Sequence, residues 1–191
     1  MSSPATLALL ADLLEYPGPD LPGRLDAGLS DAPVRGSAAA APLGRFRDEL
    51  AREGYVGFQE AYTRVFDFDP ESAPYLGHHL FGEDMRRGAF MAHLKKRYAE
   101  TGLSSGTEVP DHLSAVLRFA ARLEPGEEAD ELVHDCLVPA AARLGRALEQ
   151  KASPYALVLQ ALLLALQPFD EPTSPREDAT CRPSSSSSSP M

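Results

Sequence analysis

The sequence is poor in the features that mark disulfide-rich, metal-binding or nucleic-acid-binding proteins. It has two cysteines, Cys136 and Cys181, which lie far apart and form no CxxC pattern, so neither a disulfide framework nor a cysteine-rich metal site is expected. A reducing, cytoplasmic setting fits this usage. The net charge of −10 would repel a phosphate backbone, and the nearest basic cluster, residues 95–97, is typical of the solvated face of a helix, so we expect no nucleic-acid partner.

Long apolar runs are missing as well. The most apolar stretch extends from Pro154 to Leu166 and is shorter than the roughly 20 residues that a membrane-spanning helix needs. We interpret it as a central buried helix and expect no membrane insertion. The first residues carry no basic segment, and acids appear at Asp12 and Glu15, so a signal peptide is not expected.

Motifs of common enzyme classes are absent too: the sequence has no HExxH, no GxSxG and no GxxxxGK[ST]. Cys136 lies on an apolar helical stripe, which is typical of a core residue. Asp111-His112 superficially resembles the pair of HD-like metal-dependent hydrolases, but no convincing set of further ligands accompanies it. The sequence therefore favours a binding protein with no catalytic residue, no metal and no cofactor. An HD-like hydrolase remains an alternative, as does a helical adaptor with an unrelated partner.

What the sequence does contain is helical periodicity. Apolar residues recur at helical spacing, and no segment alternates convincingly with the period of a strand. We predict an all-α fold, a single-domain bundle of about eight or nine helices over residues 1–166. Ser3 and Ser153, each followed by proline, are expected to cap helices, and Pro139 is expected to kink or break one. Residues 30–41 are interpreted as a loop. Residues 167–191, rich in proline and serine, are interpreted as a disordered tail.

The segment from Glu108 to Leu113 places a proline, an acid and an imidazole together at a predicted helix start. Because Pro110 disfavours helical angles at the preceding residue, Asp111 is the expected N-cap, which contributes about 1 kcal/mol, and His112 would be a surface residue of the first turn. Alternatively, Asp111 and His112 border a groove and hydrogen-bond a ligand. Capping and ligand contact do not exclude each other.

Four segments, in this order and spacing, resemble the TorD/DmsD superfamily of redox-enzyme maturation chaperones, and more closely its NarJ branch. They are LLADLLEYP (residues 9–17), YTRVFD (62–67), YLGHHLFGED (75–84, leading to Arg87-Gly88 and Tyr98-x-x-x-Gly102) and EVPDHL (108–113). Each motif is weak alone, whereas the four together are fairly specific across roughly residues 5–166.

The resemblance implies a TorD-like helical fold and a cytoplasmic chaperone without catalytic activity. Its partner would be the catalytic subunit of a molybdenum-dependent reductase, with respiratory nitrate reductase as the leading candidate. Such chaperones bind the N-terminal segment of that subunit and assist molybdenum cofactor insertion before membrane assembly. In the family the Asp-His pair is tied to the peptide interaction. The predicted peptide-binding residues are Asp111, His112, Glu108, Pro110, Tyr62, Phe66, Asp67, Tyr75, His78, Asp84 and Arg87.

The sequence departs from the family pattern at a few positions. Val109 replaces the usual leucine, and Arg64 and Arg118 stand where acids are common, which would alter the specificity for the client segment. We expect carboxylates on the rim of the groove, such as Asp67, Asp84 and Asp111, to meet basic residues of the client. Residues 67–84 are expected to form one wall of the groove or a hinge.

Overall fold

The structure is a computed structural model that describes residues 3–103 and 109–167. The first half of the chain forms α1 (Pro4–Leu13), α2 (Leu21–Ser30), α3 (Ala32–Arg35), α4 (Ala40–Tyr62), the π-helix Thr63–Asp67, the 3-10 turn Pro70–Ser72 and α5 (Leu76–Phe81). The second half forms α6 (Arg86–Glu100), α7 (Leu113–Ala120), α8 (Glu127–Glu131), the π-helix Leu132–Leu137, α9 (Val138–Gln150) and α10 (Tyr155–Leu166). These described residues contain no strand, only an isolated bridge between Tyr75 and His112. The all-α prediction is confirmed.

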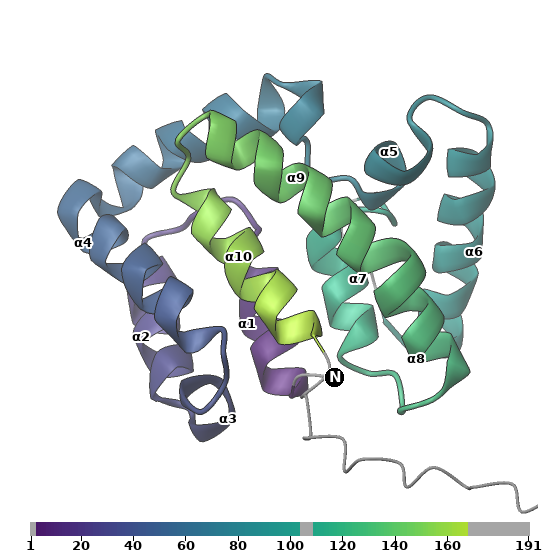
Figure 1. Cartoon of the computed structure of the whole chain (residues 1–191), viewed down its shortest axis with the longest axis horizontal. Helices are drawn as coiled ribbons and strands as arrows, with labels where there is room; N and C mark the ends of the chain where they lie inside the picture. The colour runs from purple at the N-terminus through teal and green to yellow at the C-terminus, as the bar shows by residue number, and fades with distance from the viewer. Residues whose placement is uncertain (1–2, 104–108, 168–191) are drawn as a thin grey trace, which may run out of the picture.

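The helix α10 lies at the centre of the bundle (Figure 1) and packs against α4, α9 and α1. On one side α2 packs on α4, and on the other α5 joins α6 to α9. Seven of the residues of α10 are buried, as expected for the most apolar stretch of the sequence. Within the described part of the chain, no helix is long and apolar enough to cross a membrane.

A cluster of aromatic rings anchors α10 to α4. The ring of Tyr155, at the start of α10, lies 5.6 Å from that of Phe46, 5.9 Å from Phe58, 5.7 Å from Tyr62 and 5.1 Å from Phe66. Burial raises the pKa of the Tyr155 hydroxyl well above its usual range. Because four of these rings come from α4 and the segment that follows it, this cluster fixes the position of residues 58–66, which carry the candidate site.

Two local predictions are confirmed by the backbone. The Ser3 hydroxyl accepts the N–H of Thr6 at 3.2 Å and so caps α1, and the Ser153 hydroxyl accepts the N–H of Tyr155 at 3.3 Å. Pro139 does not divide the helix in two: the π-helix Leu132–Leu137 leads directly into α9 at Val138, so the irregularity near the proline is a change from π to α geometry. Cys136, in this π-helix, is half-buried and packs against the core.

The loop predicted for residues 30–41 is wrong. This segment contains α3, with Pro33 in its first turn and the side chain of Val34 buried, and α4 already begins at Ala40. Proline in the first turn supports a helix, because the missing N–H would be unpaired there anyway. All but the first residue of the tail predicted for 167–191 lies outside the described residues, so the domain boundary stays a prediction.

Candidate functional site

Two motifs that are far apart in the sequence meet in the structure. The N–H of Leu76 donates to the carbonyl of Asp111 at 2.7 Å, and the N–H of Leu113 donates to the carbonyl of Pro74 at 2.8 Å. This short antiparallel bridge joins the start of α5 to the start of α7 and sets the rings of Tyr75 and His112 5.7 Å apart. The third and fourth motifs therefore form one structural unit.

Asp111 is fully buried in this unit and holds an arginine that reaches the surface. Its Oδ2 accepts a hydrogen bond from Arg87 Nε at 2.8 Å, and the Arg87 guanidinium lies over the Tyr75 ring, 5.5 Å from its centroid. A Cβ on Gly77 would lie 2.8 Å from Asp111 Oδ2 and 2.9 Å from Arg87 Cγ, so only glycine leaves room for this pair. The buried carboxylate thereby fixes the direction of a half-buried guanidinium.

The predicted roles of Asp111 and His112 in helix capping are wrong. The N-cap of α7 is His112, whose Nδ1 accepts the N–H of Ser114 at 3.2 Å, and its side chain is buried rather than exposed. Asp111 does not cap α7: its Oδ2 faces Arg87 and its buried Oδ1 has no hydrogen-bond partner among the described residues, and burial means that it is not a rim carboxylate. An accepting Nδ1 places the His112 proton on Nε2.

Five of the predicted site residues line one open cleft of about 470 Å³, which we call the charged cleft. Its walls come from the segment after α4, from α5 and from the start of α6. The five predicted residues are Phe66, Asp67, Tyr75, His78 and Arg87, and they are joined there by Phe68, Asp69, Pro70, Ala73 and Glu83. Residues 67–84 thus supply most of the lining, as expected for one wall of a groove.

Three contacts hold this wall in place. Lys151, in the turn between α9 and α10, donates to the carboxylate of Asp69 and lowers the pKa of that group. Nε2 of His79 lies 2.8 Å from the carbonyl of Ala73, and Arg143 of α9 donates to the His79 carbonyl. Burial is the largest cause that lowers the pKa of His79, because it disfavours the charged imidazolium.

The structure places other predicted residues outside the charged cleft. Tyr62 is buried and its hydroxyl donates to the carbonyl of Leu14 at 3.3 Å. Asp84 is exposed, pairs with Arg86 at 3.2 Å and accepts its N–H at 2.8 Å, so its carboxylate is engaged at the start of α6. The Pro110 carbonyl accepts the hydroxyl of Tyr98 at 2.8 Å. Glu108 lies outside the described residues.

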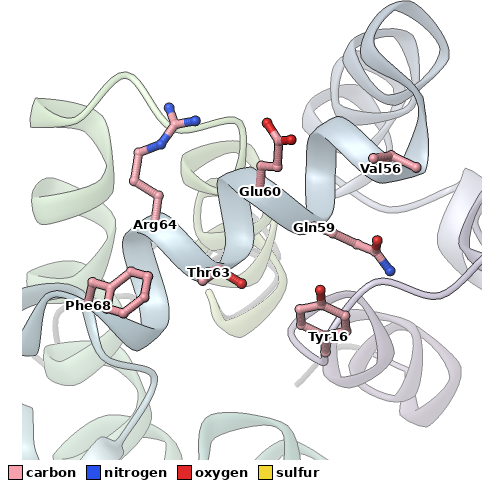
Figure 2. Close-up of a pocket in the computed structure, with 7 residues that line it drawn as sticks. All are labelled: Tyr16, Val56, Gln59, Glu60, Thr63, Arg64 and Phe68. Carbon is pink, nitrogen blue, oxygen red and sulfur yellow. The ribbon is translucent and has the colours of Figure 1, made fainter.

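Sequence reasoning missed a second hollow beside the charged cleft. It has a volume of about 490 Å³, and Figure 2 shows its lining around the second half of α4. We call it the apolar hollow; its residues are Tyr16, Val56, Gln59, Glu60, Thr63, Arg64 and Phe68. Tyr16 and Arg64 belong to the recognised motifs, and Phe68 directly follows one. Val56 gave no signal because it lies outside both the core stripe and the motifs.

The two arginines that depart from the family pattern have different surroundings. Arg118 of α7 donates to Glu15 at 2.6 Å and to Asp12 at 2.7 Å, so its charge ties α7 to α1. The expected effect of Arg118 on client specificity therefore has no support in this arrangement. Arg64 is exposed and lines the apolar hollow. Residues 3–103 and 109–167 contain no group of three or more histidines, cysteines or acids that could hold a metal ion.

The fold and the site together define an all-helical domain with an open surface cleft lined by aromatic and charged residues. Residues 33–159 match the family described as nitrate reductase delta subunit, and the chain belongs to this family. The predicted resemblance to the NarJ branch is thus confirmed.

Individual relatives agree with this assignment. The nitrate reductase molybdenum cofactor assembly chaperone NarJ of Escherichia coli K12 is 31% identical over 161 residues, which cover 82% of this chain and 67% of the relative. The probable chaperone of the same name from Bacillus subtilis is 36% identical over 109 residues, covering 56% of this chain and 58% of the relative. The nitrate reductase-like protein NarX of Mycobacterium tuberculosis is 34% identical over 151 residues, which are 78% of this chain but 22% of that protein.

Proposed function

We propose that this protein is a dedicated assembly chaperone for a nitrate reductase. It acts in the cytoplasm on the catalytic subunit of that enzyme, assists insertion of the molybdenum cofactor before membrane assembly, and catalyses no reaction itself. Membership of the delta-subunit family and the names of its relatives support the client class.

The charged cleft is the proposed binding site for the N-terminal segment of that client. The observation that carries this proposal is the convergence of two sequence motifs on one cleft, with a third packed behind it through Asp111, and with aromatic rings, exposed acids and one oriented arginine on its walls. Aromatic rings would bury apolar residues of the segment, and acids such as Asp67 and Glu83 would meet its basic residues. His112 and Asp111 act from behind the cleft, through Tyr75 and Arg87.

Titration calorimetry tests the proposal directly. The probe is a synthetic peptide with the N-terminal sequence of the nitrate reductase catalytic subunit from the same organism, and the control is a scrambled peptide of the same composition. We expect binding with a Kd of about 1 μM or below, which corresponds to roughly −8 kcal/mol. The full-length subunit should also co-purify with the protein. Equal binding of the two peptides, together with no co-purification, would rule the proposal out.

A further inference from the structure

The apolar hollow gathers three large apolar side chains at the surface. Tyr16 is 56% exposed, Val56 55% and Phe68 79%. Single exposed apolar residues are ordinary, but a group of them around one hollow is typical of an interaction surface. In Figure 2 Tyr16 and Val56 lie at one end of the hollow and Phe68 at the other, with Thr63 between them.

The hollow is preformed, because its walls are held by the core. The Tyr16 ring meets the buried Tyr62 ring edge-on at a centroid distance of 5.5 Å. Gln59 Nε2 donates to the carbonyl of Pro17 at 2.8 Å, which ties α4 to the segment after α1. A ligand would therefore meet a fixed surface and would lose little free energy in ordering it.

The apolar hollow and the charged cleft are adjacent, because Phe68 lines both, and we refer to the two together as the strip. Along this strip the exposed acids Glu60, Asp67 and Glu83 have no ion-pair partner in the described part of the chain. Among the described arginines and lysines that line the strip, Arg64 is the one without an ion pair, since Arg87 is held by Asp111. The strip thus offers apolar contacts together with an excess of negative charge, which suits a basic amphipathic segment.

We propose that the apolar hollow is a second subsite for the client segment and takes aromatic or aliphatic side chains from an amphipathic helix whose basic residues face the charged cleft. A helix presents apolar anchors at positions i, i+3 or i+4 and i+7 along one face, so one helix can reach successive subsites on such a strip. This inference rests on the proposed function and adds where the apolar face of the segment is recognised.

The test uses Val56, which lines only the apolar hollow. Its matched control is Met85, whose side chain is 93% exposed and lines neither hollow. We expect Val56→Ser to raise the Kd of the client peptide about three- to tenfold, as loss of a buried apolar side chain would, and Met85→Ser to leave it within about twofold. Val56→Trp should also weaken binding, because the larger ring would fill the hollow.

A peptide variant identifies which part of the client is involved. Replacing the apolar residues of the peptide by serine should remove the difference between wild type and Val56→Ser, whereas replacing its basic residues should leave that difference intact. A photo-crosslinker at position 56 should capture the client peptide, and one at position 85 should not.

The outcomes separate the two proposals. If wild type binds the peptide but both Val56 variants bind it equally well and position 56 captures nothing, the second subsite is wrong and the proposed function stands. If wild type itself does not discriminate the peptide from its scrambled form, the proposed function fails. A change in oligomeric state on Val56→Trp at unchanged peptide affinity would instead assign the hollow to a second copy of the chain and overturn the inference.

Discussion

At the scale of single residues, Asp111 influences the surface without reaching it. Its carboxylate is fully buried, yet it determines where the Arg87 guanidinium lies, and that guanidinium lies over the Tyr75 ring. When a buried carboxylate pairs with a single base, removal of either member destabilises the fold, chiefly because the other member is left buried without a partner. Asp111 is therefore a positioning residue in the proposed site, and Arg87 is the residue that would touch the client.

Asp111→Asn and Arg87→Ala should have nearly the same effect on peptide binding. Asparagine keeps the shape of the side chain but loses the charge that orients Arg87, so we expect each change to raise the peptide Kd about three- to tenfold. The double variant should bind no worse than either single variant, because both changes remove one arrangement. Calorimetry with the client peptide measures this, and additive losses would contradict the positioning role. We expect Asp111→Asn to lower stability by about 1–3 kcal/mol.

His79 should make stability depend on pH. Burial, opposed by the Ala73 carbonyl and aided by the nearby charges of His78 and Arg143, lowers the pKa of His79 in the folded state. As pH falls through about 6.5, the unfolded chain takes up a proton that the folded protein does not, so the stabilisation present above that pH is progressively lost. Denaturant melts of wild type and His79→Gln between about pH 8 and pH 5 measure the slope. The dependence of stability on pH should be weaker for His79→Gln than for wild type. The control is His134→Gln, which removes an exposed histidine.

At the scale of elements, a kink divides α4 into a first half that packs in the core and a second half that lines the apolar hollow. Gly54 has φ 72° and ψ 165° in the middle of this helix, a conformation that other residues rarely adopt. Before the kink Phe46 and Leu50 pack into the core, and after it Val56, Gln59 and Glu60 line the apolar hollow. The kink therefore sets the second half of α4 at the angle that the hollow requires.

Two alanine substitutions in α4 should change the free energy of unfolding in opposite directions. Gly54→Ala forces a side chain into a left-handed conformation and should cost about 1 kcal/mol or more. Gly44→Ala meets nothing within 4 Å and lies in regular helix, so it should stabilise by up to about 1 kcal/mol. Thermal melts should show a lower Tm for the first variant and a higher one for the second, with shifts of about 2–4 °C per kcal/mol. A Gly54→Ala protein as stable as wild type would show that the kink is not needed.

Sequence patterns predicted the long elements of this fold better than its short ones. Periodicity predicted α10, and proline placement predicted an irregularity near the start of α9, because burial and a missing N–H act locally. The four-residue α3 escaped prediction because one apolar residue, Val34, is too little for a periodic signal. Asp111 was predicted as the cap because the sequence does not reveal that its side chain is buried and pairs with Arg87, 24 residues earlier. The motifs pointed to residues of the charged cleft but not to the apolar hollow, because Val56 lies in no motif and on no apolar stripe.

At the scale of the whole molecule, the net charge of −10 and the acids Glu60, Asp67 and Glu83 along the strip both favour the approach of a basic segment. A field of one sign attracts a basic segment from a distance and increases its association rate, whereas apolar contacts act only after docking. The two parts of the proposed strip should thus contribute to different steps of binding. The charged cleft would govern how fast the client arrives, and the apolar hollow would govern how long it stays.

Ionic strength should separate these steps. Raising the salt concentration from about 0.05 M to about 0.5 M shortens the Debye length several-fold, so the association rate of a basic client peptide with wild type should fall about tenfold. Asp67→Asn removes an exposed cleft carboxylate and should give a shallower salt dependence, because less attraction remains to be screened. Val56→Ser should keep the wild-type salt dependence and raise the dissociation rate instead, since an uncharged contact is lost. Stopped-flow or surface-based kinetics resolves both rates, and equal salt slopes for wild type and Asp67→Asn would show that the cleft acids do not steer the client.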